Sequence, residues 1–237
     1  MRKRSYPSPA DFALLPRAPR NASRVPALTS LYHNPKRGDY GDSRYPGNCS
    51  GNLIRDLLDY YDARRVLDPM TGSGTCYDVC RDLGIYCIPD DLHAGGDAAS
   101  VDAFTELGSF DFVWLHPPYW RMKRYSDDPR DLSTAKTLKA FLEGYQRVLH
   151  NCVDALAPYG HLAVLMGDYS DPDVGFVPLT FHTKRIAFDL GLRQCATDII
   201  RFSHGASSST KRYRSSFIPG LHDVCMVFEK PGEGIER

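Results

Sequence analysis

The chain has 237 residues, with 29 Lys and Arg against 29 Asp and Glu, 42% apolar residues and seven Cys. This length suffices for one domain with an ordered extension, and no apolar stretch approaches the ~20 residues of a membrane span. No apolar segment follows the charged start, which argues against a secretory signal, and the Cys spacing shows no zinc-type pattern. We therefore expect a cytoplasmic protein with reduced thiols, no bound metal and no membrane partner.

The neutral total conceals an uneven distribution of charge. Residues 1–45 contain 9 Lys or Arg against 3 Asp, residues 46–200 contain 14 against 22 acids, and residues 201–237 contain 6 against 4. An acidic body between two basic flanks points to a polyanionic partner, although solvated basic tails are also common.

The elements expected along the chain alternate between helices and strands. Residues 1–45 are rich in Pro and lack apolar periodicity, which predicts an extended arm that needs a surface to become ordered. The following elements are helix 50–62 capped by Ser50, strand 64–69, helix 77–83, strand 84–91, strand 110–120, helix 132–158, strand 161–169, helix 178–191, strand 193–202 and strand 222–230. This order predicts a mostly parallel sheet, with the last two strands antiparallel because their loop is too short for a crossover helix.

The first candidate motif, VLDPMTGSGT over residues 66–75, joins a strand, an acid and a Gly-rich turn. Small residues in such a turn let backbone amides approach a ligand at a helix N-terminus. No Lys follows Gly74, as a phosphate-binding loop requires, and Tyr77 stands where a dinucleotide fingerprint needs its third Gly. Asp68 suits a cationic ligand better than a pyrophosphate, and a plain tight turn is the simpler alternative.

The second candidate motif, HPPYW over residues 116–120, follows the apolar strand FDFVWL. Two prolines fix the backbone and leave adjacent carbonyls able to accept hydrogen bonds, and the next aromatic offers a flat face. At the carboxyl end of a parallel strand, these residues could bind a planar ring that carries an amino group. A strand ending in Pro-Pro with core aromatics is the simpler alternative.

Together, the two motifs resemble those of the S-adenosylmethionine-dependent amino methyltransferases, which methylate adenine N6 or cytosine N4 in DNA. LDPMTGSGT resembles the cofactor motif, with Met70 in place of an aromatic, and HPPYW resembles the catalytic motif, in which Asp, Asn or Ser precedes Pro-Pro. RYPGNCSGNLIRDLL, RYSDDPRDLS and HDVCMVFEK also resemble family segments, so the resemblance covers roughly residues 44–230.

The resemblance implies an α/β, Rossmann-like class I methyltransferase fold. We expect a mostly parallel seven-stranded sheet with a C-terminal antiparallel strand and helices on both faces. The implied domains are a basic, Pro-rich arm over residues 1–45 and a methyltransferase catalytic domain over residues 46–237, without a separate target-recognition domain.

The resemblance also implies S-adenosyl-L-methionine as the cofactor. Asp68, Gly72 and Gly74 would hold its methionine end, and Asp90 or Asp91, between which the sequence does not decide, would hold the ribose. The full set of expected cofactor-binding residues is Asn48, Cys49, Ser50, Asp68, Pro69, Met70, Gly72, Gly74, Thr75, Asp90, Asp91 and Asp97, the last for the adenine amino group.

The implied reaction is methyl transfer to a flipped-out base, with His116, Pro117, Pro118, Tyr119 and Trp120 as the catalytic residues. His116 and the Pro117 carbonyl would accept the amino hydrogens, while Tyr119 would stack on the base and Trp120 would lie at its far edge. His116 departs from the family pattern, because neutral imidazole has one acceptor nitrogen and loses it on protonation, near pH ~6.5 when unperturbed. The change is compatible with a pH-dependent enzyme, with another amino substrate such as RNA, or with an inactive relative.

Nucleic acid is the expected partner, DNA first and RNA as the alternative. The expected contact residues are Arg121, Lys123, Arg124, Lys211, Arg212 and Arg214. Basic residues with a few interleaved aromatics suit contacts to the phosphate backbone and stacking better than the reading of base edges. We therefore expect low sequence specificity or a very short target sequence, and binding that depends strongly on salt. Adenine N6 is favoured over cytosine N4 by family frequency alone, and RNA base methylation or non-catalytic nucleic-acid binding remain alternatives.

Overall fold

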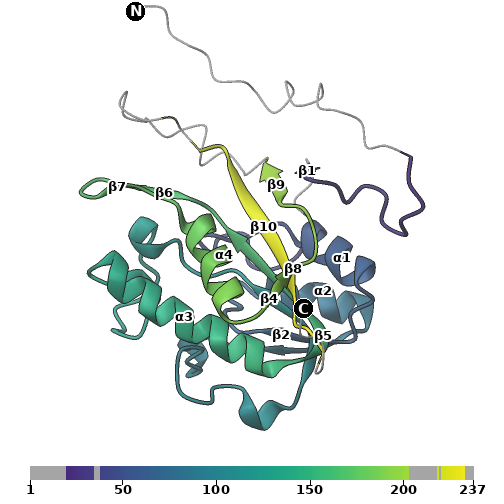
Figure 1. Cartoon of the computed structure of the whole chain (residues 1–237), viewed down its shortest axis with the longest axis horizontal. Helices are drawn as coiled ribbons and strands as arrows, with labels where there is room; N and C mark the ends of the chain where they lie inside the picture. Colours follow the sequence, from purple (N-terminus) through teal and green to yellow (C-terminus); the bar gives the residue numbers. More distant parts are fainter. Residues whose placement is uncertain (1–19, 35–37, 203–217, 219, 233–237) are drawn as a thin grey trace, which may run out of the picture.

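The structure is a computed structural model that describes residues 20–34, 38–202, 218 and 220–232 (Figure 1). Its main sheet has the strand order β3-β2-β4-β5-β10-β9-β1, and β8 also pairs with β10. The strands are β1 (Leu31–His33), β2 (Arg65–Asp68), β3 (Tyr86–Pro89), β4 (Phe110–Leu115), β5 (Leu156–Met166), β8 (Arg193–Gln194), β9 (Ile199–Phe202) and β10 (His222–Glu229). A separate hairpin is formed by β6 (Tyr169–Asp171) and β7 (Gly175–Val177).

The strand directions follow the expected pattern. β2 pairs in parallel with β3 and β4, β4 pairs in parallel with β5, and β1 pairs in parallel with β9. β10 is antiparallel to β5, β8 and β9. The prediction of a mostly parallel sheet with a C-terminal antiparallel strand is therefore confirmed.

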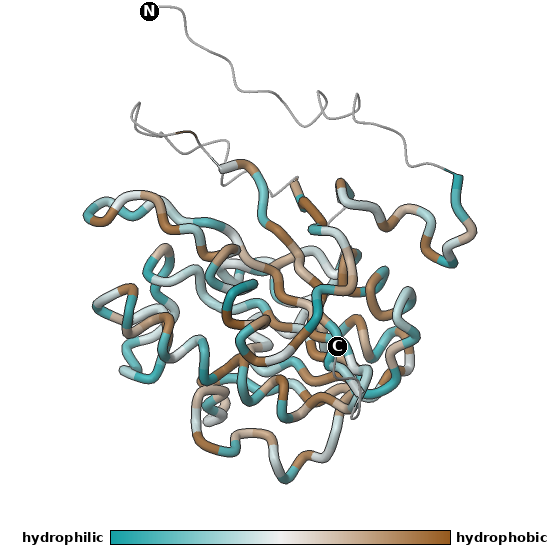
Figure 2. Tube along the Cα trace, viewed as in Figure 1, coloured by the Kyte–Doolittle hydropathy of each residue, from teal (hydrophilic) through white to brown (hydrophobic). Residues whose placement is uncertain are grey.

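Helices cover both faces of the sheet. α1 (Gly51–Tyr60) and α2 (Thr75–Leu83) pack on one face, where Phe112 and Trp114 of β4 belong to the same buried cluster. α3 (Leu138–Ala155) and α4 (Leu179–Asp189) pack on the other face, against the alternate residues Val113 and Leu115. Because successive side chains of a strand point to opposite faces of the sheet, the core is divided into two layers. Figure 2 shows hydrophobic colours along much of β10 in the middle of the molecule. Within the described ranges, no helix has the length and apolar character that a membrane span requires.

The helix starts depend on capping side chains. Ser50 accepts a hydrogen bond from the Asn52 amide and caps α1, as expected. α3 begins after Thr137, which accepts from the Ala140 amide, rather than at residue 132 as predicted. Residues Leu132–Thr134 form a separate short 3-10 helix capped by Asp131. Apolar periodicity alone predicts one helix from residue 132, but the cap at Thr137 starts a separate helix.

The sheet has eight strands rather than the expected seven, because part of the N-terminal arm joins its edge. Leu31 is in register with Ile200 of β9. Tyr32 is 5% exposed, and its hydroxyl donates to Asp56 over 2.8 Å. Three residues are too few to show an apolar period, which is why the sequence predicts only an extended arm here.

Replacing Tyr32 with Ala tests whether this part of the arm belongs to the fold. Losing a buried aromatic ring should lower the free energy of unfolding by about 3 kcal/mol. Leu31 precedes it on the same strand but is 38% exposed, so Leu31→Ala should cost less than about 1 kcal/mol. Urea denaturation of both variants makes the comparison, and equal small effects would contradict the pairing of β1 with the sheet.

Candidate functional site

A pocket of about 900 Å³, including its open mouth, lies beyond the carboxyl ends of β2 and β4. Its lining residues are drawn from five stretches of the chain, within residues 45–49, 68–76, 91–99 and 114–118 and at Tyr125 and residues 130–132. The carboxyl edge of a parallel sheet is where α/β folds of this type bind ligands, since the connecting loops meet there. Both candidate motifs contribute side chains to this one pocket.

The Gly-rich turn forms the floor between β2 and α2. Gly74 is the N-cap of α2 at φ +79°, and Gly72 has φ +48°, so both occupy the left-handed region that favours glycine. A Cβ on Gly72 would lie 3.0 Å from the ring of Tyr45. The Gly72 amide donates to Asp91 over 2.9 Å, which ties the turn to the end of β3.

Asp68 is the most desolvated acid of the pocket. Its side chain lies at the end of β2 in a residue that is only 2% exposed. Asp68 Oδ1 and the nearby Thr71 Oγ1 are buried, and neither has a hydrogen-bond partner among the described residues. Burial raises the pKa of the Asp68 carboxyl well above its usual range. Because buried polar groups are normally paired, these two oxygens indicate a ligand that brings hydrogen-bond donors or positive charge.

The charge around Asp68 is also predominantly negative. Three further acids, Asp91, Asp97 and Asp131, line the pocket, and its basic groups are Arg130, His93 and His116. Arg130 pairs with Asp128 over 2.7 Å. His93 Nδ1 lies 2.8 Å from Asp91 Oδ1, and this hydrogen bond raises the pKa of His93. Such a surface favours a cationic ligand over an anionic one.

The wall that faces the Gly-rich turn contains residues that the sequence did not single out. The rings of Tyr45 and Tyr125 stack with centroids 5.9 Å apart, and burial raises the pKa of Tyr45 to about 12. Asp131 accepts from the Ser126 and Ser133 amides over 2.9 and 2.8 Å, which folds this loop against the pocket. Tyr45 and Tyr125 are 80 residues apart in the chain, and no local sequence pattern indicates that their rings meet at the pocket.

His116 connects the pocket to a buried charge pair. Its Nε2 lies 3.1 Å from the Tyr119 hydroxyl, which donates to Asp223 Oδ2 over 3.5 Å. Asp223 is ion-paired with Arg201, and both side chains are nearly buried. The ring of Tyr119 packs against Gly167, where a Cβ would lie 2.6 Å from it. Tyr119 is thus held between His116 and the β9–β10 strand pair, a network that no motif in the sequence indicates.

The pocket brings together most of the expected cofactor and catalytic residues. Those that line it are Cys49, Asp68, Pro69, Met70, Gly72, Thr75, Asp91, Asp97, His116 and Pro118. The expected residues that are adjacent to it without lining it are Asn48, Ser50, Gly74, Asp90, Pro117, Tyr119 and Trp120.

Local bonding explains why several of these side chains point elsewhere. Asn48 donates to the Asp42 carbonyl over 2.6 Å, and Ser50 caps α1. The Asp90 carboxylate fills the space beside Gly96, where a Cβ would lie only 1.8 Å from Asp90 Oδ1. Of the two acids between which the sequence does not decide, Asp91 is therefore the one at the pocket.

The expected role of Trp120 at the edge of a base is corrected by the structure. Its side chain belongs to the core and is 1% exposed, and its indole nitrogen donates to the Ala135 carbonyl over 2.9 Å. A ring that is fully enclosed offers no face to a substrate.

Arg121 also differs from its expected role in nucleic-acid contact. Its guanidinium makes two 2.6 Å hydrogen bonds to Asp171 and one of 2.8 Å to Asp173. The ion pair neutralises this charge and attaches the segment that follows HPPYW to the β6–β7 hairpin. Lys123 is exposed, and Arg124 forms a surface pair with Asp127 and donates to the Ser126 carbonyl over 3.0 Å. The other expected contact residues, Lys211, Arg212 and Arg214, lie outside the described residues.

Comparison with known proteins finds similar folds among solved methyltransferase structures. No protein-family model matches the chain, and no curated protein matches it. The structure is similar to that of a proposed DNA modification methylase from Thermus thermophilus complexed with S-adenosyl-L-methionine (19% identity, 73% of this chain and 58% of that chain covered, TM-score 0.42). It is also similar to TrmN from Thermus thermophilus (18%, 78% and 50%, 0.44) and to a SAM-dependent methyltransferase from Archaeoglobus fulgidus (18%, 77% and 95%, 0.46).

The chain spans 58% of the Thermus methylase and 50% of TrmN. At these identities and TM-scores, the evidence for function has to come from the pocket itself.

Replacing Asp68 with Asn tests whether an unpaired acid is buried here. An unfolded carboxyl ionises near pH ~3.9, whereas the folded one has a raised pKa, so stability falls as pH rises from about 4 through the folded value. Asp68→Asn should therefore raise the free energy of unfolding of the ligand-free protein at pH 7 by about 1–3 kcal/mol. The substitution should also remove the contribution of Asp68 to the pH dependence of the free energy of unfolding, as measured by denaturation.

The matched control is Asp127→Asn, since the Asp127 side chain is 95% exposed and lies outside the pocket. It should change stability and slope little. If Asp68→Asn lowers the free energy of unfolding and leaves its pH dependence unchanged, Asp68 is not a buried acid with a raised pKa.

Proposed function

We propose that this chain is an S-adenosylmethionine-dependent methyltransferase that methylates an exocyclic amino nitrogen of a nucleic-acid base, with adenine N6 in DNA as the first target. The observation that carries the proposal is that the motif residues His116 and Pro118 line a single pocket with the buried acid Asp68, whose Oδ1 has no hydrogen-bond partner among the described residues. One motif would bind a cationic cofactor, and the other would hold an amino group next to it.

The residues of the pocket fit this cofactor. Its ammonium group would satisfy the buried oxygens of Asp68 and Thr71, which lack protein partners in the described part of the chain. Asp91 already accepts from the Gly72 amide and from His93, and a carboxylate has further lone pairs for ribose hydroxyls. Asp97 accepts from the Ala99 amide over 3.0 Å and would face the adenine amino group. When bound, the cofactor supplies an electrophilic methyl group on a sulfonium.

The acidic walls suit both the binding and the release of this cofactor. Transfer removes the positive charge from sulfur, so the acids around the pocket attract the charged cofactor more strongly than its neutral product. A preorganised set of acceptors matters here more than a strong base, because the nucleophile is a neutral amino group.

The Tyr119 network bears on how His116 would act. Asp223 accepts only, so the Tyr119 hydroxyl, which donates to it, can accept from His116 Nε2–H. In that tautomer neutral His116 has one acceptor nitrogen, as the proposed role requires. His116 would accept one amino hydrogen of the base, and the Pro117 carbonyl would accept the other. Holding both hydrogens turns the nitrogen lone pair towards the methyl group.

The resemblance of LDPMTGSGT and HPPYW to the amino methyltransferase motifs supports an exocyclic amino nitrogen of a base as the target, and adenine N6 is placed before cytosine N4 on family frequency alone. The pocket supports a planar, neutral substrate with an amino group, bound beside a cationic cofactor. Of the expected phosphate-binding residues that the structure describes, exposed Lys123 remains the best candidate.

A product assay tests the proposal directly. The protein is incubated with methyl-labelled S-adenosylmethionine and separate pools of DNA and RNA, and the modified nucleosides are identified by mass spectrometry. We expect N6-methyladenine in DNA, with a yield that falls steeply as salt increases. If only the RNA pool is labelled, the substrate is RNA rather than DNA. If the protein binds the cofactor and labels neither pool, the transferase assignment is contradicted.

The pH dependence of the rate tests the role of His116. As pH falls through the imidazole range, near ~6.5 for an unperturbed group, protonation removes the acceptor and the rate should fall. His116→Asn supplies a carbonyl oxygen that does not titrate, so its profile should be flat from about pH 5.5 to 8. His116→Ala should lower kcat by about 10²-fold at pH ~8. A flat wild-type profile would exclude His116 as the acceptor.

A further inference from the structure

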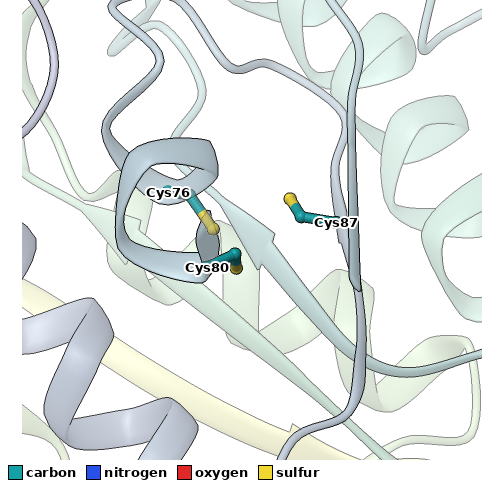
Figure 3. A group of neighbouring side chains, drawn as sticks. All are labelled: Cys76, Cys80 and Cys87. Carbon is teal, nitrogen blue, oxygen red and sulfur yellow. The ribbon is translucent and has the colours of Figure 1, made fainter. Parts of the chain in front are cut away.

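Three cysteines outside the His116 motif form a compact cluster beneath the Gly-rich turn. Cys76 and Cys80 lie on α2 and Cys87 lies on β3, and their three sulfur atoms are all within 4.8 Å of one another (Figure 3). The cluster was not expected from the sequence, because the three positions have no metal-type spacing along the chain.

The fold itself brings these side chains together. Residues four apart on a helix share one face, which places Cys76 and Cys80 one turn apart on the side of α2 that is buried. Cys87 is in register with Val66 of β2, so it lies on the strand next to the one that leads into the Gly-rich turn. Two of the sulfurs belong to buried residues and the third to a partly exposed one, which provides a route from solvent.

The chemistry of the cluster is uniform. Among the described residues, the group that could hold an ion consists of these three thiols, without His, Asp or Glu. Each residue offers one sulfur atom as a ligand, and metal binding would deprotonate the thiols. Thiolates are soft ligands that select Cu(I) or Zn(II) over hard cations such as Mg²⁺.

We propose that Cys76, Cys80 and Cys87 form a binding site for a thiophilic d10 metal ion. Sulfurs bound at about 2.3 Å to a trigonal metal lie about 4 Å apart, so closing the present cluster requires shifts below about 1 Å. Three sulfurs complete the coordination of Cu(I), whereas Zn(II) requires a fourth ligand, which solvent could provide on the Cys87 side. The bound ion would link α2 to β3 directly behind the cofactor pocket.

The link would affect the pocket because Cys76 is one of its lining residues and follows Thr75 at the start of α2. An ion held between α2 and β3 binds the folded chain, in which the three sulfurs meet, more tightly than the unfolded one, so it stabilises this region. The site is independent of the proposed methyl transfer, and its test does not require activity.

Metal titration of the reduced, chelator-treated full chain tests this proposal. Cu(I) is delivered from a competing colorimetric chelator, and Zn(II) is delivered in a parallel experiment. We expect one equivalent of at least one of these ions to bind, X-ray absorption to show sulfur ligation, and the melting temperature to rise. Failure of both ions to bind would overturn the site.

Variants locate the binding. Cys87→Ser should weaken the affinity at least about tenfold, and because Cys87 is partly exposed this variant should keep its fold, which circular dichroism checks. Cys195→Ser is the matched control, since that thiol is exposed and lies outside the cluster, and its affinity should be unchanged.

Alkylation followed by mass spectrometry gives a second readout on the wild-type chain. One equivalent of metal should protect Cys87, the partly exposed thiol of the cluster, and leave Cys195 reactive. Equal affinity in the wild type and Cys87→Ser, or protection of other cysteines instead, would contradict the proposal.

Discussion

One desolvated carboxyl group underlies the pocket and the chemistry proposed for it. Asp68 ends a central strand and is only 2% exposed, and its Oδ1 has no hydrogen-bond partner among the described residues. An unpaired buried charge costs several kcal/mol, so folding alone gives no reason to keep an acid there. A ligand that brings positive charge and donors removes the cost, and further acids around the pocket act in the same direction.

The sheet brings this carboxylate together with the second motif. β2 and β4 are neighbours, so the turn after Asp68 and the segment from His116 open on one side of the sheet. The other half of the sheet contributes through the Arg201–Asp223 pair on β9 and β10, which holds the Tyr119 hydroxyl and thereby the His116 ring. The antiparallel closing strands thus support the site as well as complete the core.

Much of the fold and part of the site could be predicted from the sequence. The alternation of helices and strands and the Gly-rich turn have local signatures, which is why the parallel sheet and the position of Asp68 were expected. Trp120 and Arg121 could not be assigned, because their burial and pairing depend on Ala135 and Asp171, which are distant along the chain. The same holds for the stacked Tyr45 and Tyr125, and for the three clustered cysteines, which meet only once α2 packs beside β3.

The most direct test of the central claim is the pKa of Asp68, measured by carbon-13 NMR with and without S-adenosylmethionine. Without ligand, burial should hold this pKa well above the usual range. With the cofactor bound, its positive charge should bring the pKa down to or below that range. A pKa that does not respond to the cofactor, or that is already normal without it, would contradict the account.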